Sequence, residues 1–242
     1  MNEDLIILER KDSIAILTLN RPKVYNALNQ DIKAQLVKLL DQCKNDDSIR
    51  AIILTGAGKG FCAGADMSDL SSRPSPRDVR DDLNQNYGAI VRRITEMHKP
   101  VIAAINGPMA GAGIGLGLAC DYKIMADHAS MRFAFVNIGL VSDAGSTWFL
   151  ARSVGYTKAL EIIYGGNKIS AEECLKMGIV NRTYPQEDLM EAAMKLAAHL
   201  AKKPPLAFEA TKRAINFALT HGLFETISFE AHAQMELIAS DD

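Results

Sequence analysis

Two glycine-flanked loops hold the residues of this chain that are best suited to chemistry. The first spans residues 58–67 and reads GKGFCAGADM, and the second spans residues 106–113 and reads NGPMAGAG. Each follows an apolar run and is expected to open a helix, whose first N–H groups have no partner inside the helix. Two such donors directed at one carbonyl oxygen form an oxyanion hole. A carbonyl held in this way makes the neighbouring carbon acidic, and this is the chemistry that the loops predict.

The elements that must position these loops follow from hydrophobic patterning. Residues 51–54 and 101–105 are short and continuously apolar, which is typical of parallel strands buried on both faces. Strand patterns then give way to a mainly helical remainder, so the predicted fold class is α/β with a helical C-terminal part. Further strands are expected at residues 5–9, 14–20 and 122–126, a loop at 71–82, and helices from 29–31 onward and at 87–97, 114–119, 146–153, 157–164, 171–177, 188–202, 204–220 and 223–238.

Composition excludes several classes of partner. The 242 residues carry a net charge of −2, which gives no bulk attraction to nucleic acid or to a membrane surface. No run approaches the roughly 18 apolar residues of a membrane span, and the acidic N-terminus lacks the apolar core of a signal peptide. The four cysteines form no C-x-x-C pair, so no metal or redox site is predicted. We expect a cytoplasmic protein without a nucleic-acid or membrane partner.

Familiar nucleotide-binding and hydrolytic motifs are also missing. The sequence contains no Walker A, G-x-G-x-x-G, G-x-S-x-G or H-E-x-x-H pattern. The five histidines are far apart along the chain and are interpreted as ordinary surface or core residues. The glycine-rich loops therefore need an explanation other than phosphate binding or a serine nucleophile.

Five ordered stretches carry a resemblance to a known family: residues 19–28, 54–67, 99–107, 120–121 and 138–145. On these stretches the chain resembles the enoyl-CoA hydratase/isomerase (crotonase) family over essentially its whole length. The resemblance implies a crotonase-like spiral of ββα turns and an acyl-CoA thioester as substrate. Coenzyme A would be part of that substrate, so no separate cofactor and no metal are expected.

The same resemblance implies a division of the chain and an assembly. Residues 1–185 would form the spiral core with the acyl-CoA site, and residues 186–242 would form a helical region that builds a homotrimer or a dimer of trimers. Family members usually continue for about one more helix beyond the point where this chain stops, on the order of ten to twenty residues. We therefore expect the final helix, which often covers the acyl pocket, to be lacking.

The resemblance also assigns roles to individual residues. It places the two oxyanion donors at the backbone N–H groups of Ala65 and Ala112; the second position is usually glycine, and alanine keeps the N–H. Its substrate-binding positions are Lys23, Ala27, Ala63, Gly64, Asp66, Met67, Gly111 and Phe135. Structural alternatives stay open for three of them. Lys23 also fits an exposed turn, Asp66 also fits the cap of a short helix over residues 67–70, and Phe135 also fits the core beside the acyl pocket. Cys62 is interpreted as a small buried hydrophobic residue rather than a nucleophile.

The family's hydratase glutamates are missing from this chain. The corresponding positions hold Gly115 and Phe135, and neither can move a proton. Adding water to a C=C bond requires one group that deprotonates the water and one that protonates the α-carbon. The sequence therefore does not favour a simple hydratase.

A different carboxylate, Asp143, stands where some isomerases of the family carry their single acid/base. One carboxylate is sufficient to move a double bond, because it takes a proton from the α-carbon and returns it to the γ-carbon. Apolar neighbours in the sequence (Phe133, Phe135, Trp148 and Phe149) are expected to raise its pKa toward a useful value. The structural alternative is that Asp143 caps a helix beginning at Ala144.

Three functional hypotheses follow. The first is an isomerase that moves the double bond of an enoyl-CoA, with Asp143 as acid/base and the N–H groups of Ala65 and Ala112 holding the thioester oxygen. The second is a hydratase, or a ring-type isomerase acting on an aromatic-derived acyl-CoA. The third is an acyl-CoA-binding protein without chemistry, which Gly115 and Phe135 motivate. Turnover of a substrate panel distinguishes them.

Overall fold

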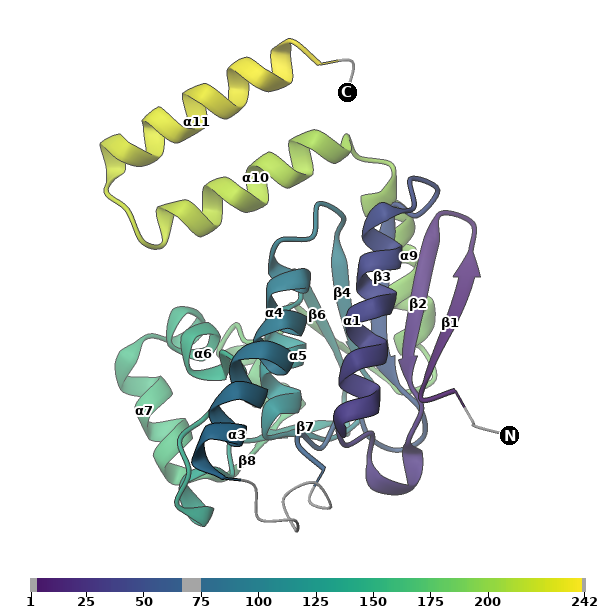
Figure 1. The fold of residues 1–242 in the computed structure, drawn as a ribbon, viewed down its shortest axis with the longest axis vertical. Coiled ribbons are helices and arrows are strands. Elements are labelled where there is room, and N and C mark those ends of the chain that lie inside the picture. Colours follow the sequence, from purple (N-terminus) through teal and green to yellow (C-terminus); the bar gives the residue numbers. More distant parts are fainter. Residues whose placement is uncertain (1–3, 67–74, 241–242) are drawn as a thin grey trace.

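A six-stranded sheet forms the centre of the molecule in the computed structural model, which describes residues 4–66 and 75–240. Its strand order is β1-β2-β3-β4-β6-β9 (Figure 1). Only the β1–β2 pair is antiparallel, and the other neighbours are parallel. The strands are β1 Ile6–Lys11, β2 Ile14–Leu19, β3 Ala51–Gly56, β4 Val101–Ile105, β6 Tyr122–Ala126 and β9 Arg182–Tyr184.

The register of β3 and β4 explains why the two glycine-rich loops meet. These strands are parallel neighbours, with Ile52 opposite Val101 and Leu54 opposite Ala103. Carboxyl ends of parallel strands lie at the same edge of a sheet, which is where ligands bind in open α/β folds. Both strands are buried along their whole length, as their continuous apolar sequence predicts.

Helices cover the sheet on its two faces. The helices α1 Gln30–Asn45, α4 Gly88–Thr95 and α5 Ala112–Ala119 lie in front of it in Figure 1. Behind it, α9 Leu189–Ala201 buries Leu189, Ala193 and Ala197. The side chain of Asn29 caps α1 by accepting from the N–H of Ile32, which confirms the helix start expected there.

A second, three-stranded sheet was not predicted. It has the order β5-β7-β8 and consists of β5 Met109–Ala110, β7 Ser130–Arg132 and β8 Lys168–Ser170. Strands of two or three residues contain too few positions to show a period of two. β9 was missed for the same reason.

The predicted loop at residues 71–82 is wrong for its second half. Pro76–Asp82 forms α3, and a π-helical turn over Leu83–Tyr87 joins it to α4. Ser75 and Asp78 form a reciprocal capping box, and Pro76 stands at the first helical position, where its missing N–H costs nothing. Polar composition and proline thus marked a helix start here. Residues 71–74 lie outside the described part of the chain.

The remaining helices continue toward the C-terminus. They are α6 Ser146–Val154, α7 Tyr156–Gly165, α8 Ala171–Lys176, α10 Pro205–Ala218 and α11 Leu223–Ile238, with short 3₁₀ turns at Pro22–Val24 and Val136–Ile138. Among the described residues, no helix is long and apolar enough to cross a membrane.

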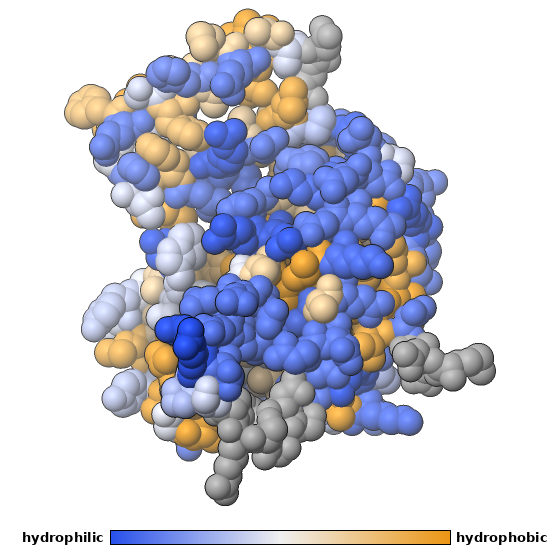
Figure 2. All heavy atoms as spheres, in the orientation of Figure 1, coloured by the Kyte–Doolittle hydropathy of each residue, from blue (hydrophilic) through white to orange (hydrophobic). Residues whose placement is uncertain are grey.

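The C-terminal helices α10 and α11 form a hairpin that stands apart from the sheet (Figure 1). Apolar side chains gather on this hairpin in Figure 2. Phe224 is 83% exposed and Ile238 is 77% exposed. The predicted division at residues 185 and 186 stays a prediction; α9, on its C-terminal side, packs on the central sheet.

Candidate active site

The two glycine-rich loops pack directly against each other. A methyl carbon placed on Gly64 would lie 2.9 Å from the nitrogen of Ala112 and 2.9 Å from the carbonyl oxygen of Ala110. One placed on Gly111 would lie 3.5 Å from the carbonyl oxygen of Ala63 and 4.0 Å from the Phe135 ring. The absence of a side chain at Gly64 therefore leaves the Ala112 N–H uncovered.

The direction of the Ala65 N–H follows from its pairing with Leu28. Leu28 donates its N–H to the carbonyl of Gly64 at 2.7 Å and accepts from the N–H of Asp66 at 3.2 Å. In a parallel bridge, the residue between two such contacts turns its own N–H and C=O to the opposite side. The Ala65 N–H consequently points away from Leu28, and it donates to no other residue in the described part of the chain.

The N–H of Ala112, the second predicted donor, stands at the start of α5. Gly111 precedes the helix with φ of +52°, and Ala112 is the first helical residue. Its N–H has no partner within the helix and donates to none of the residues in 4–66 and 75–240. The positive φ falls on Gly111 and not on Ala112, so an alanine at position 112 introduces no backbone strain.

The loop that carries Asp143 contacts the same helix through Ala144. A methyl carbon on Gly115 would lie 2.2 Å from the carbonyl oxygen of Ala144 and 2.7 Å from its Cβ. Because Gly115 is three residues from Ala112, the loop that carries Asp143 contacts α5 about one turn, or roughly 5 Å, from the donor. The space that a side chain at position 115 would need, where the resemblance expects a hydratase glutamate, is therefore filled by the backbone of Ala144.

The environment of the Asp143 carboxyl group suits proton transfer. Its Oδ1 atom is buried and has no hydrogen-bond partner among the described residues. Burial, the largest cause, and the negative charge of Asp82 together raise the pKa of Asp143 to about 6. A carboxyl group with such a pKa exchanges protons near neutral pH.

Helix capping does not explain Asp143. The helix α6 begins at Ser146, where the sequence pattern predicts it and not at Ala144 as the capping alternative requires, and its N-cap is Gly145 without a side-chain hydrogen bond. Only the backbone carbonyl of Asp143 takes part, accepting from the N–H of Ser146 at 2.9 Å and from its hydroxyl at 2.7 Å. The backbone of Ala144 has φ of +50°, an unfavourable conformation for alanine that this loop maintains.

Asp66 and Ala27 share one partner, Arg21. The guanidinium of Arg21 lies 2.7 Å from the Asp66 carboxylate and donates to the carbonyl of Ala27 at 2.6 Å. Lys23 lies on the exposed 3₁₀ turn of the same segment. Met67 lies outside the described residues. Substrate contacts at these positions stay predictions.

Two asparagines that received no role from the sequence organise the first loop. Asn26 is fully buried, and its side-chain amide nitrogen lies within 2.8–3.2 Å of the carbonyls of Ala57, Gly60 and Phe61. Asn106 donates to the carbonyls of Gly58 and Gly60 and accepts from the N–H of Gly56. For Asn106 the available signal was an asparagine immediately after a buried strand, a residue type suited to binding loop backbone. Asn26 follows the short turn Pro22–Val24 and had no such signal.

Cys62 is buried beside the first loop, with its sulfur 3.3 Å from the carbonyl oxygen of Asn26. Desolvation raises the pKa of this thiol to about 12. A thiol with such a pKa is not ionised near neutral pH and does not act as a nucleophile.

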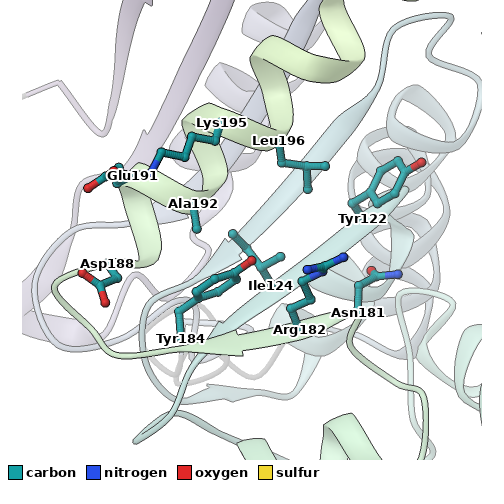
Figure 3. A pocket seen from close by; sticks show the side chains of 10 residues that line it. All are labelled: Tyr122, Ile124, Asn181, Arg182, Tyr184, Asp188, Glu191, Ala192, Lys195 and Leu196. Carbon is teal, nitrogen blue, oxygen red and sulfur yellow. Dashed lines mark ion pairs between the residues drawn. The ribbon is translucent and has the colours of Figure 1, made fainter.

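A separate cleft of about 710 Å³ lies between β6, β9 and α9. Figure 3 shows Tyr122, Tyr184 and Arg182 around it, with Glu191 and Lys195 paired on α9. None of the predicted site residues lines this cleft. Within residues 4–66 and 75–240, no group of three potential metal ligands gathers there or elsewhere.

Comparison with known proteins decides the family. Residues 9–242 match the family model described as enoyl-CoA hydratase/isomerase. The chain belongs to the enoyl-CoA hydratase/isomerase family. Its membership confirms the crotonase fold and identifies the chain as an enzyme of this superfamily.

Relatives within the family differ in the reaction that their names give. The chain is 38% identical over 234 residues to the 1,2-epoxyphenylacetyl-CoA isomerase of Escherichia coli (strain K12), covering 96% of this chain and 89% of that protein. It is 33% identical over 238 residues to the short-chain-enoyl-CoA hydratase of Clostridium acetobutylicum, covering 98% and 90%. A solved enoyl-CoA hydratase from Bacillus anthracis superposes with a TM-score of 0.94 at 32% identity, covering 99% and 93%. The reaction within the family therefore has to be argued from the site.

Proposed function

We propose that this enzyme moves the double bond of an enoyl-CoA with Asp143 as its single acid/base. The observation that carries the proposal is the buried, unpartnered Oδ1 of Asp143, on a loop that contacts the helix opened by Ala112. The N–H groups of Ala65 and Ala112 would hold the thioester oxygen. Leaving a buried carboxylate oxygen unpartnered is unfavourable, and use of that oxygen in proton transfer explains why it is kept so.

The proton steps balance without another reagent. The Asp143 carboxylate takes a proton from the α-carbon of a 3-enoyl-CoA, and the C–H electron pair moves into the thioester to form a dienolate. The two backbone N–H groups stabilise the negative charge on its oxygen. Asp143 then returns the proton to the γ-carbon, which leaves a conjugated 2-enoyl-CoA and regenerates the carboxylate.

The position that would supply a second carboxylate supports one-base chemistry. At Gly115, the Ala144 carbonyl occupies the space that a glutamate side chain requires. Phe135 is buried against Gly111 and carries no ionisable group. Hydration has no obvious pair of acid and base in this arrangement.

The test measures absorbance of the conjugated thioester with purified enzyme. A 3-enoyl-CoA should gain this absorbance with the unmodified enzyme, and Asp143→Asn should lower the rate by about 10²–10⁴ while acyl-CoA binding is retained. Unchanged turnover in Asp143→Asn would remove Asp143 from the mechanism. Loss of absorbance from a 2-enoyl-CoA would instead support hydration.

A ring-type rearrangement is the second candidate. It is favoured by the 38% identity to a protein named 1,2-epoxyphenylacetyl-CoA isomerase and by the aromatic ring of Phe135 next to Gly111. Aromatic side chains bind aromatic groups by offset or edge-to-face contact. Turnover of an aromatic-derived acyl-CoA, with no response to straight-chain enoyl-CoA, would select this candidate. Binding without turnover of any of these substrates would select the non-catalytic alternative.

We further propose that the exposed C-terminal hairpin is covered in a homotrimer or a dimer of trimers. The apolar side chains on α10 and α11 support this, since a patch of that kind on a soluble protein marks an interface. Light scattering coupled to gel filtration measures the mass directly, and a monomer at micromolar concentration would contradict the assembly.

A further inference from the structure

The ion pair between Arg21 and Asp66 lies next to Ala65, whose N–H is the first proposed oxyanion donor. Asp66 immediately follows Ala65, and its carboxylate lies 2.7 Å from the Arg21 guanidinium. The two side chains are only 20% and 10% exposed. A charged hydrogen bond in such partly desolvated surroundings is stronger than one at the surface.

Arg21 connects both chain segments that meet at Ala65. The same guanidinium nitrogen that reaches Asp66 also donates to the carbonyl of Ala27 at 2.6 Å. Ala27 precedes Leu28, whose N–H and C=O bind Gly64 and Asp66 on either side of Ala65. The ion pair therefore closes a ring that runs from Arg21 through Ala27 and Leu28 to Asp66.

The base of this ring is itself fixed. The N–H of Arg21 donates to the side-chain oxygen of Asn26 at 2.9 Å, and the N–H of Asn26 donates to the carbonyl of Arg21 at 2.9 Å. The Asn26 amide in turn holds the carbonyls of Gly60 and Phe61. The segment 21–28 is thus fixed by its own hydrogen bonds and binds the backbone of the first loop.

We propose that Arg21 and Asp66 are positioning residues that direct the Ala65 N–H at the substrate's thioester oxygen. This inference rests on the proposed function, because it assumes that the Ala65 N–H binds that oxygen. The pair acts through the backbone and not by touching the reacting atoms. Oxyanion donors stabilise a transition state only when they are held at the correct place and angle before the reaction begins.

This role predicts a separation between binding and chemistry. Loss of the pair should lower kcat by about tenfold to a hundredfold through misplacement of the donor, with KM nearly unchanged. If Asp66 instead contacts the substrate directly, its loss should raise KM. Arg21→Lys keeps the positive charge and should restore part of the kcat that Arg21→Met loses.

The decisive experiment measures polarisation of the bound carbonyl and needs no turnover. Infrared difference spectra of a 2-enoyl-CoA labelled with carbon-13 at the thioester carbonyl are recorded on enzyme carrying Asp143→Asn. We expect the carbonyl band to move to lower frequency on binding. We expect Arg21→Met, and Asp66→Asn as the variant that best preserves shape, to lose at least about half of that movement while the dissociation constant changes less than about threefold.

A matched control is available on the first hairpin. Arg10 also forms an ion pair with an aspartate, Asp46, at 2.6 Å and belongs to β1. Arg10→Met should leave the band movement unchanged. The full band movement in Arg21→Met and in Asp66→Asn would overturn the positioning role alone, whereas no movement in the Asp143→Asn parent would overturn the oxyanion hole and with it the proposed function.

Discussion

The loop that ends at Ala65 and the loop that carries Asp143 both pack on α5 through a glycine, but they are built in opposite ways. Gly113 meets the carbonyl of Cys62 on the donor side, and Gly115 meets the carbonyl of Ala144 on the acid/base side. The donor loop is held by the amides of two buried asparagines and by the Arg21–Asp66 pair.

The acid/base loop, residues 141–145 around Asp143, has fewer side-chain hydrogen bonds to fix it. The Oγ of Ser142 and the Oδ1 of Asp143 are buried without partners within the described residues, and Ala144 has a positive φ. Val141 next to them is 82% exposed. The difference fits the two proposed tasks. A fixed dipole must not reorganise during the reaction, whereas a group that gains and loses a proton is better left without a fixed hydrogen bond.

The largest expected effect comes from breaking the contact between the acid/base loop and α5. Gly115→Ala would place a methyl carbon 2.2 Å from the backbone oxygen of Ala144, so the loop must move. We expect kcat to fall by about 10²–10⁴, the range for losing a general acid/base. Gly117→Ala is the control, since its methyl carbon would meet the flexible Met109 sulfur at 3.2 Å. Steady-state measurement of kcat for both variants tests whether the loop that carries Asp143 depends on this contact. Equal rates would show that the loop does not depend on this contact.

On the donor loop, Asn26→Gly should lower stability. Glycine tolerates the φ of +59° at this position, so the substitution removes the side-chain hydrogen bonds without adding backbone strain. Leaving several buried carbonyls unpaired should cost about 3 kcal/mol of unfolding free energy. Urea unfolding followed by circular dichroism measures this loss. A cost below about 1 kcal/mol would mean that water replaces the amide and that the donor loop is not rigid.

On the acid/base loop, Asp143→Asn should have the opposite effect. The pKa of Asp143 is raised in the folded protein to about 6, above its unfolded value, so ionisation opposes folding. That penalty is complete above pH 6 and disappears as the pH falls toward 4. Asp143→Asn should therefore raise unfolding free energy at pH 7 by roughly 1–3 kcal/mol and change it little at pH 4. Unfolding curves at pH 7 and pH 4 test whether Asp143→Asn raises the unfolding free energy. A lower unfolding free energy at pH 7 would contradict the idea that the Asp143 carboxylate opposes folding, whereas the Asn26 amide supports it.

The smallest effect concerns the charge near Asp143. Because Asp143 must be ionised to act as the proposed base, kcat/KM should fall about tenfold per pH unit below about pH 6. Asp82 raises the pKa of Asp143 and is held by the buried Lys33. Asp82→Asn should therefore move this acid limb to lower pH, while Asp41→Asn, which removes the partner of Arg93, should leave it in place. The pH profiles of kcat/KM distinguish the two, and identical profiles would exclude an influence of Asp82.

Much of the fold was predictable because it repeats simple patterns. The continuously apolar runs at 51–54 and 101–105 predicted β3 and β4, and the helix expected at 171–177 corresponds to α8. α11 matches its expected range, Leu223–Ile238. Such features depend on neighbours in sequence, which a periodic pattern records.

The candidate site was predictable only in part. The glycines marked the meeting of the loops, since only the absence of a side chain lets Gly64 lie against Ala112. Asp143 was found through resemblance, whereas the Ala144 carbonyl against Gly115 and the reach of Arg21 to Asp66 depend on contacts between distant segments. Sequence spacing contains no record of such contacts, and the roles of Arg21, Asn26 and Asn106 were therefore missed.

The contact between Gly115 and Ala144 also restricts how this enzyme can be redesigned or can diverge. A glutamate introduced at position 115 would not simply add a second carboxylate, because it would collide with the backbone of the loop that presents the first. One-carboxylate and two-carboxylate chemistry are thus separated by a coupled change of helix and loop. The single substitution Gly115→Glu is therefore expected to displace the loop that carries Asp143.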